Sequence, residues 1–257
     1  MLKHSPEFVV RMAATPDDVA AAQRLRYAVF VEEMGADGAL VDHVARREAD
    51  EFDPFAMHLL LEDMHPAAPA QLVGAYRLMD LACAAKAGRF YSETEFDLTA
   101  LRNGHRRILE LGRACVHPDY RGGLAMHRIW SGLAGFVLEK KYRILFGVAS
   151  FHGTDLGPLA QPLSYLHANH LASRELAPVA RASGAVAMDL LPAQTIDRKA
   201  AMVATPALIK AYLRLGGAIG QGAFVDHNFQ TTDVCLVLDT ADMDPKSRKL
   251  YATGGLQ

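Results

Sequence analysis

Residues 108–123, ILELGRACVHPDYRGG, combine an apolar run with charged side chains that could do chemistry. Glu110 in such a run can accept or relay a proton, and Arg113 follows three positions later. The run ends in a turn that contains Pro118 and a pair of glycines. Glycines there let the backbone approach a ligand, and the start of a following helix offers free N–H groups to a phosphate or an oxyanion. A tight strand-to-helix connection without a ligand is the alternative interpretation.

Glu110 and Arg113 would point to opposite faces of a regular strand, because side chains alternate along it. Gly112 between them could mark a β-bulge that lets both side chains reach one site. The alternative is that Glu110 and Arg113 form a structural ion pair.

A second charged group precedes this stretch. Asp50 and Asp53 stand three positions apart in an acidic segment, where they could hold a cationic substrate. Arg26 and Arg77 could bind a substrate carboxylate, or could pair with the two aspartates and pre-organise the segment. Arg77 lies in an apolar run, so it needs a partner if it is buried. A solvated acidic loop remains open as an alternative.

The elements that must position these residues follow from periodicity and from helix signals. Thr15 is a candidate N-cap with Pro16 at the first helical position, and Thr205 and Pro206 repeat that pattern. We read residues 35–53 as a long loop. The predicted strands are 7–13, 57–63, 71–80, 108–117, 142–151, 185–191 and two between 223 and 239, and the predicted helices are 15–34, 124–141, 161–176 and 205–217.

This order predicts an α/β (α+β) fold with a central, mostly antiparallel twisted sheet flanked by helices. We expect one domain over residues 1–240, with a core at 6–155 and a C-terminal elaboration at 156–240. Residues 241–257 read as a polar tail.

Composition narrows the function classes. The chain has 257 residues, a formal net charge of −2 and a sequence pI near 6.6, which argues against a general nucleic-acid binder. Its three cysteines include no CxxC pair, which favours a reducing compartment without disulfides. No apolar run is long enough to span a bilayer, so we expect a cytoplasmic protein, with peripheral contact at the inner membrane face as an alternative.

Several common sites are disfavoured by the absence of their motifs. No P-loop, GxGxxG or GxSxG motif stands in the sequence. His167 and His170 could share a helix face, yet no third ligand is evident, so no metal is predicted.

The turn itself resembles a known family. Val116, Pro118, Tyr120, Arg121 and the Gly122–Gly123 pair are similar to the turn that binds the acyl donor in GNAT N-acyltransferases. Leu124 and Met126 replace the later glycine and small residue of that turn. This departure favours an acyl thioester on a carrier protein, which lacks the pyrophosphate of coenzyme A.

The charged residues extend the resemblance. Arg26, Asp50, Asp53, Arg77, Glu110 and Arg113 occur in the order that is typical of acyl-homoserine-lactone synthases. Gly112 replaces a serine of that group, and no tryptophan follows Phe30. Segments along nearly the whole chain resemble the L-ornithine Nα-acyltransferases of ornithine-lipid synthesis, among them RLRYAVFVEEMGA, ELGRACVHPDYR, SFHGTD, LSYLHANHLA, LIKAYLRLGG and VDHNFQTTDVCLVLD.

That resemblance implies transfer of a 3-hydroxyacyl group from acyl carrier protein to the α-amine of L-ornithine, which gives lyso-ornithine lipid. No cofactor is expected beyond the phosphopantetheine that carries the acyl group. Two alternatives stay open: the same chemistry on glutamine, lysine or a siderophore precursor, and a non-catalytic module that binds the carrier protein or lipid.

The resemblance also assigns roles. Glu110 is the candidate general base, and Arg113 belongs with it to the predicted catalytic residues. Arg26, Asp50, Asp53 and Arg77 are predicted to bind the acceptor. The predicted acyl-donor and pantetheine-binding residues are Ala114, Cys115, Val116, Arg121, Gly122 and Gly123, with backbone N–H groups at 114–116 as oxyanion donors.

Partners follow from charge. Acyl carrier protein is acidic, so a basic docking patch is expected. Its candidates are Arg106–Arg107, Arg121 with Arg128, and Lys140, Lys141 and Arg143. Lys246, Arg248 and Lys249 could contact anionic lipid head groups.

Overall fold

The computed structural model describes residues 5–38, 40–66 and 70–243. These residues form two compact units, and β7 (Ile108–Val116) runs from the second unit into the first. The first unit takes in the described residues up to Gly88 together with Leu111–Lys141. The second comprises Arg89–Glu110 and the described residues from Tyr142 onward. The interpretation of residues 1–240 as one domain stays a prediction, and most of the predicted tail lies outside the described residues.

The first unit is built on antiparallel strands. β1 (Phe8–Met12) pairs with β4 (Met57–Asp63), and β4 pairs with β5 (Gln71–Asp80). β7 is the next strand of the sheet beside β5. The hairpin of β4 and β5 was predicted from its two apolar runs, and the structure confirms it. Its register shifts between Leu61 and Glu62, which marks a bulge.

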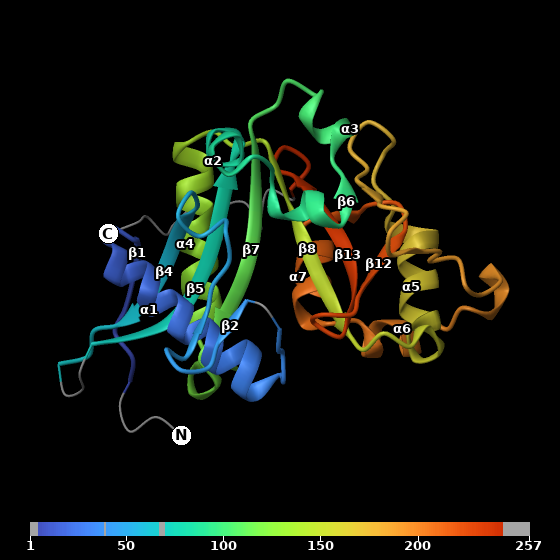
Figure 1. The fold of residues 1–257 in the computed structure, drawn as a ribbon. Coiled ribbons are helices and arrows are strands. Elements are labelled where there is room, and N and C mark those ends of the chain that lie inside the picture. The colour runs from blue at the N-terminus through green and yellow to red at the C-terminus, as the bar shows by residue number, and fades with distance from the viewer. Residues whose placement is uncertain (1–4, 39, 67–69, 244–257) are drawn as a thin grey trace. The chain divides into compact units, whose positions relative to one another are not determined.

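Two helices cover opposite faces of these strands (Figure 1). α1 (Pro16–Arg26) begins at the predicted cap, because Thr15 and Asp18 form a reciprocal capping box. α1 packs on the face that carries Leu60 and Ala75, and α4 (Ala125–Glu139) packs on the face of Gly74. The other elements of this unit are η1 (Tyr27–Glu33), β2 (Val41–Asp42), β3 (Arg47–Glu48), α2 (Leu81–Ala87) and η3 (Pro118–Tyr120).

The segment 35–53 is more ordered than the predicted loop. β2 and β3 pair antiparallel, with Val41 opposite Glu48 and Asp42 opposite Arg47. Strands of two residues leave almost no periodic signal in a sequence, so this correction depends on contacts that the sequence does not reveal.

The second unit contains the parallel pairing. The first three residues of β7 run parallel to β8 (Ile144–His152), and β8 pairs antiparallel with β13 (Thr231–Asp239). The order continues to β12 (Ala223–Asp226) and β10 (Ala185–Val186), and β11 (Ala218–Ile219) pairs with β13. The predicted fold, a mostly antiparallel sheet flanked by helices, is confirmed.

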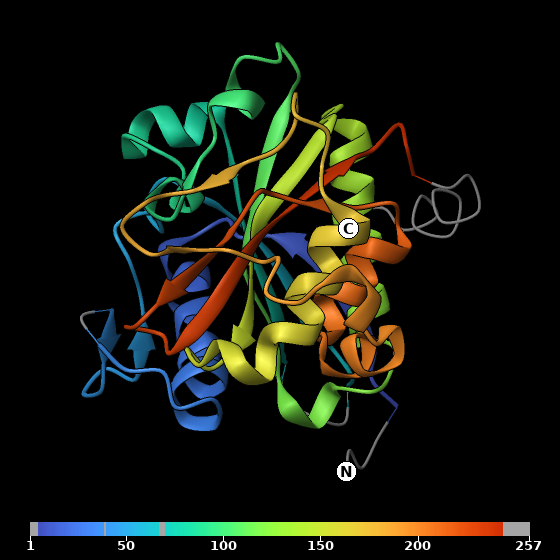
Figure 2. The ribbon, with the colours of Figure 1, turned by 90° about the vertical axis from the view of Figure 1, so that its right-hand side faces the viewer.

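Helices of the second unit follow β8 in the chain. α5 (Leu156–His170) lies beside α6 (Arg198–Ala204), and α7 (Ala207–Arg214) packs on β13, as Figure 2 shows in yellow, orange and red. α5 begins five residues before the predicted start, because Asp155 caps it. The remaining elements of this unit are η2 (Tyr91–Thr94), β6 (Phe96–Asp97), α3 (Thr99–Arg102), β9 (Val179–Ala180) and η4 (Ala193–Thr195).

The predicted cap of α7 is wrong. Pro206 occupies the N-cap position, and the Thr205 hydroxyl donates to the carbonyl of Ala201 at 2.8 Å. Thr205 therefore closes α6 instead of opening α7. Among the described residues, no helix is both long and apolar enough to cross a membrane.

Candidate active site

Arg26 lies at the centre of a buried charge network in the first unit. Its side chain is 1% exposed, and its two terminal nitrogens donate to both oxygens of Asp53 at 2.8 Å each. Its Nε donates to Glu48 at 2.5 Å, and Nη2 also donates to the Glu48 carbonyl at 2.6 Å. Arg26 therefore fixes the residues around β3 to the end of α1.

Two more arginines complete the network. Arg77 Nη1 donates to Asp50 at 2.5 Å and to Asp53 at 3.1 Å. Arg113 donates from Nε to Glu48 and from Nη2 to Asp50, at 3.1 Å in both cases. Each carboxylate thus lies between two guanidinium groups, and the six side chains close into a ring. We call this set the arginine–carboxylate ring, and in order its members are Arg26, Glu48, Arg113, Asp50, Arg77 and Asp53.

The ring has three positive and three negative charges. Burial by itself would raise the pKa of Asp53, but the Arg26 and Arg77 guanidiniums hold that pKa well below its ordinary value. Arg77 and Arg113 likewise lower the pKa of Asp50 against the effect of burial. All three carboxylates are matched by arginines, so the ring is suited to holding the 48–53 segment in place.

The structure thus brings together the four predicted acceptor-binding residues, and it adds Arg113 and Glu48. Arg26 and Arg77 pair with Asp53 and Asp50, which is the pre-organising arrangement that the sequence left open. Glu48 was missed by sequence reasoning. Three arginines against two aspartates leave one positive charge unmatched, and that imbalance was the signal that could have pointed to Glu48.

Arg113 reaches the ring through an irregularity of β7. Its φ is +50°, in the left-handed region that is uncommon for residues with a side chain. This conformation interrupts the alternation next to Gly112, as expected for the predicted bulge. A Cβ added at Gly112 would meet no atom within 4 Å, so close packing is not what requires a glycine there.

Glu110 belongs to the second unit and is 3% exposed. Its Oε2 accepts a hydrogen bond from the Tyr91 N–H at 3.0 Å, and its Oε1 accepts one from the Ser92 N–H at 2.6 Å. Both amides come from the start of η2, and such donors stabilise a carboxylate in its ionised form. Beside them, the rings of Phe90 and Phe146 pack edge to face with centroids 5.1 Å apart. Glu110 is therefore a buried acceptor in a partly aromatic setting.

The predicted donor-binding turn follows β7 in the first unit. α4 begins at Ala125, directly after the glycines, and Gly122 adopts a φ of +74°. Arg121 binds both oxygens of Glu33 at 2.5 and 2.6 Å, and its Nε donates to the Val116 carbonyl at 3.0 Å. Arg121 therefore links the turn to η1.

Cys115, also among the predicted donor-binding residues, faces the core. It packs with Ala22, Leu25 and Ala75 against α1, and burial raises the pKa of its thiol to about 12. The thiol is therefore protonated at neutral pH and is a poor nucleophile. Ala114 beside it is half-buried. The assigned roles of the turn residues stay predictions.

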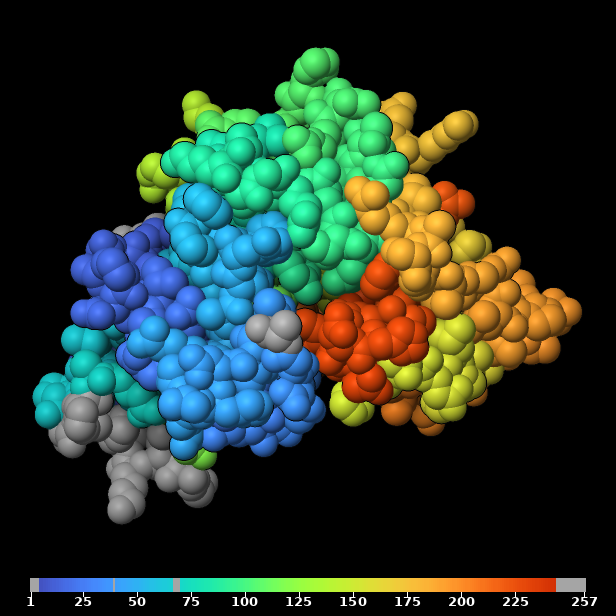
Figure 3. All heavy atoms as spheres, viewed as in Figure 1, coloured from blue at the N-terminus to red at the C-terminus, as the bar shows by residue number. Residues whose placement is uncertain are grey.

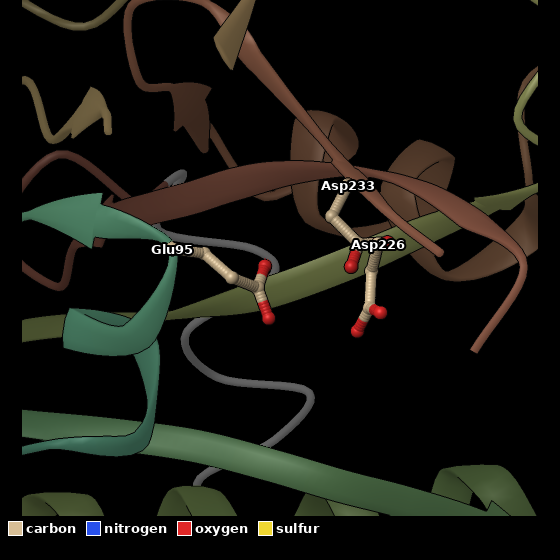
Figure 4. A group of neighbouring side chains, drawn as sticks. All are labelled: Glu95, Asp226 and Asp233. Carbon is tan, nitrogen blue, oxygen red and sulfur yellow. The ribbon is translucent and has the colours of Figure 1, made fainter. Parts of the chain in front are cut away.

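A second carboxylate cluster lies in the second unit. Oxygen atoms of Glu95, Asp226 and Asp233 lie within 4.8 Å of one another, and Figure 4 shows the three side chains converging. Sequence reasoning missed this cluster, although an aspartate within the apolar run TTDVCLVLD was a usable signal.

The strand order, the β7 turn and the helix that follows define the class of the protein, an acyltransferase of the GNAT fold. The family model described as an acetyltransferase (GNAT) domain matches residues 25–131. An N-acyl amino acid synthase from uncultured soil microbes shares the fold with a TM-score of 0.54 at 12% identity, covering 93% of this chain and 95% of that one. A CoA-dependent acyl-homoserine lactone synthase, also at a TM-score of 0.54 and 12% identity, covers 96% of this chain and 89% of its own.

Sequence similarity is more specific than the fold. The chain is 54% identical to the L-ornithine N(alpha)-acyltransferase of Rhodobacter capsulatus over 95% of this chain and 94% of that protein. The chain belongs to the L-ornithine N(alpha)-acyltransferase family.

Proposed function

We propose that this protein transfers a 3-hydroxyacyl group from acyl carrier protein to the α-amine of L-ornithine, which gives lyso-ornithine lipid. The observation that carries the proposal is the 54% identity over 95% of the chain to a relative named for acyl transfer to ornithine. Acyl-thioester aminolysis is also the reaction that the residues of β7 are suited to.

Glu110 acts as the general base. The α-amine arrives as an ammonium ion and gives a proton to Glu110, directly or through one water molecule. Its freed lone pair forms the C–N bond to the thioester carbonyl, and the C–S bond then breaks. The departing thiolate takes up one of the two protons that the nitrogen loses, and the other goes to solvent. The two backbone N–H groups hold the Glu110 carboxylate in a fixed orientation for this role.

The reaction proceeds by direct attack without an acyl-enzyme. Support comes from Cys115, whose thiol is buried and protonated at neutral pH. Backbone N–H groups at 114–116 remain the proposed donors to the tetrahedral oxyanion.

The arginine–carboxylate ring positions the site. Its arginines are engaged by its own carboxylates, so Arg26 and Arg77 serve to hold the 48–53 segment and are not proposed as the primary ligands of ornithine. Arg113 connects this segment to β7. Removing a ring member should therefore affect stability as well as turnover.

Carrier protein as the donor is supported by the side chains at the β7 turn. Leu124 and Met126 stand where a pyrophosphate-binding turn has small residues, and both are exposed. Arg121 and Arg143 are each paired with a carboxylate, Glu33 and Asp239. Lys140 pairs with Glu139, so Arg106, Arg107, Arg128 and Lys141 remain the proposed docking residues for an acidic carrier.

The test incubates the purified protein with L-ornithine and a 3-hydroxyacyl carrier protein, and mass spectrometry detects the amide. A matched reaction replaces the carrier by the coenzyme A thioester. We expect product that depends on both substrates and forms faster with the carrier. If product forms only with the coenzyme A thioester and not with the carrier, the proposed donor is wrong. If product forms only with an amine other than ornithine, that amine replaces ornithine as the acceptor. Binding of the carrier without consumption of thioester would identify a non-catalytic binding module.

A further inference from the structure

The carboxylate cluster of Glu95, Asp226 and Asp233 has no role in the reaction described so far. Glu95 comes between η2 and β6, Asp226 ends β12, and Asp233 lies on β13. Asp226 pairs with Thr231 in the β12–β13 register, so Asp226, Thr231 and Asp233 share one face of that hairpin. Glu95 extends toward the two aspartates from the left in Figure 4.

The cluster concentrates negative charge in a buried place. Glu95 and Asp233 are each 3% exposed, whereas Asp226 is partly exposed. Neither aspartate forms a salt bridge with a lysine or arginine of the described segments. Burial raises the pKa of Asp233 to about 6, and the Asp226 charge contributes to the increase. A cation bound at the cluster would stabilise the ionised form of Asp233.

A second observation points to a missing ligand. Oδ1 of Asp233 has no hydrogen-bond partner among the described residues. Against the effect of burial, side-chain hydrogen bonds from Ser150, Thr231 and Glu95 lower the pKa of Asp233 only in part. A buried carboxylate oxygen without a partner is costly, so a donor from outside the chain would stabilise Oδ1 of Asp233.

The position of Glu110 suggests which cation this is. Glu110 is opposite Phe146 on β8, and Asp233 is opposite Ser150, four residues further along the same face. At ~3.3 Å per residue, the two rows lie ~13 Å apart along the strands, and the two strand spacings from β7 across β8 to β13 add about 9.6 Å. The Cα atoms of Glu110 and Asp233 are therefore about 16 Å apart. Cys235 lies between them, and the charges of Glu110 and Glu95 both raise the pKa of its thiol.

An extended ornithine spans most of this distance, and the side chains of Glu110 and Asp233 account for the rest. Its α- and δ-nitrogens are separated by five single bonds of about 1.5 Å, which places them roughly 6 Å apart. A hydrogen bond of about 3 Å at each end brings the span between the carboxylates to about 12 Å. An ammonium group also has three N–H donors, and the three converging carboxylates can accept one hydrogen bond from each.

We propose that Glu95, Asp226 and Asp233 bind the δ-ammonium group of the acceptor, while its α-amine faces Glu110. This inference rests on the proposed function, since it assigns the second charge of the same substrate. Asp226 lies on the surface side of the cluster, and the red segment that carries it reaches the surface in Figure 3. The cluster thereby selects a diamine over an amino acid with an uncharged side chain.

The test compares ornithine with norvaline, which keeps the carbon chain and the α-amine but lacks the δ-ammonium. Asp233→Asn is isosteric and removes one charge, and Glu95→Gln is a second variant of the same kind. Asp189→Asn, at an exposed position of the same unit, is the matched control. Thermal unfolding of each variant checks that it is folded.

We expect Asp233→Asn to lower kcat/KM for ornithine roughly 10- to 100-fold, the range for hydrogen bonds to charged groups. The norvaline value should stay within about threefold of wild type, and the control should change neither. Equal losses for both substrates, or a wild type that does not discriminate between them, would overturn the proposal. So would activity that chelator removes and Mg²⁺ or Ca²⁺ restores, with the ion bound by wild type and not by Asp233→Asn.

Failure of the proposed function gives a different result. If no amine is acylated, calorimetry of ornithine binding without donor still tests the cluster. A loss of affinity of roughly 10- to 100-fold in Asp233→Asn supports it, and an unchanged affinity rejects it. If lysine or another diamine is acylated instead of ornithine, the same comparison applies to that diamine and its monoamine analogue.

Discussion

The guanidinium of Arg113 lies 3.1 Å from the carboxylate of Glu48, although 65 residues separate them along the chain. Glu48 also binds Arg26, so one carboxylate connects the end of α1, β3 and β7. Arg113 reaches it from a backbone conformation that strands rarely contain. The strained conformation and the buried ion pair therefore occur together at one position of β7.

Replacing Glu48 with glutamine should destabilise the first unit. The change removes a buried negative charge and leaves Arg26 and Arg113 each with one anionic partner fewer. Breaking one partner of a buried ion pair costs about 3–5 kcal/mol, and urea unfolding measures the difference.

Glu32→Gln is the matched control for that substitution. Glu32 pairs with Arg46 at an exposed position, and such pairs contribute about 1 kcal/mol or less. If the two variants lose the same stability, the ring does not carry the stability assigned to it.

Part of the ring could be predicted from the sequence. Arg26, Asp50, Asp53 and Arg77 were expected near one another, and an ion-paired arrangement was one of the stated alternatives. Glu48 was not expected, because it follows two arginines and reads as part of a solvated charged segment. Only the pairing of β2 with β3 directs its side chain inward, and strands of two residues are not visible as a pattern.

Longer elements were predictable because their periodicity extends over several turns or residues. β4, β5, β8, α1 and α4 all follow the predicted order. The Glu95–Asp226–Asp233 cluster was not predictable, because its members come from distant segments that only the tertiary fold brings together. Pairing across a sheet depends on register, which a single sequence does not specify.

Gly132 provides a test of the packing of α4 on β1. A Cβ added there would lie 3.0 Å from Cβ of Val10 and closer still to one of its methyl groups. Gly132→Ala should therefore cost roughly 1–3 kcal/mol in chemical denaturation, as overpacking does. The double variant with Val10→Ala should recover part of that loss, and additive losses would argue against the contact.

Glu110→Gln should lower kcat by about 100-fold or more, because general-base catalysis contributes ~10²–10⁴. Binding of the acyl donor should change little, since the substitution acts on the acceptor nitrogen. Steady-state kinetics with ornithine and a donor titration separate the two effects.

Glutamine also places an amide donor where Glu110 accepts from Tyr91 and Ser92, so the fold of the variant needs checking. Glu110→Asp keeps the charge on a shorter side chain and should retain more activity than the glutamine variant. A glutamine variant that is folded and fully active would exclude Glu110 as the base.

Cys115→Ala should keep kcat within about threefold of wild type, because the thiol is buried and remains protonated at neutral pH. Intact-protein mass spectrometry should detect no acyl adduct on wild type during turnover. The variant should lose roughly 1 kcal/mol of stability from the small cavity left beside α1. An adduct at Cys115, or loss of turnover without loss of fold, would replace direct attack by a covalent mechanism.

Asp233 should make the stability of the protein depend on pH in an unusual direction. Its pKa is about 6 in the folded protein against an ordinary value of 3.8, so the folded state binds the proton more tightly than the unfolded chain does. Stability from this group is therefore lost as the pH rises from about 4 to about 6, and a shift of this size corresponds to roughly 2–3 kcal/mol.

Asparagine resembles the protonated form of Asp233, so the free energy of unfolding of Asp233→Asn should match that of wild type near pH 4 and exceed it by about that amount at pH 7. Urea unfolding of both proteins at the two pH values measures the difference, and a gap that is the same at both would show that Asp233 does not titrate between them.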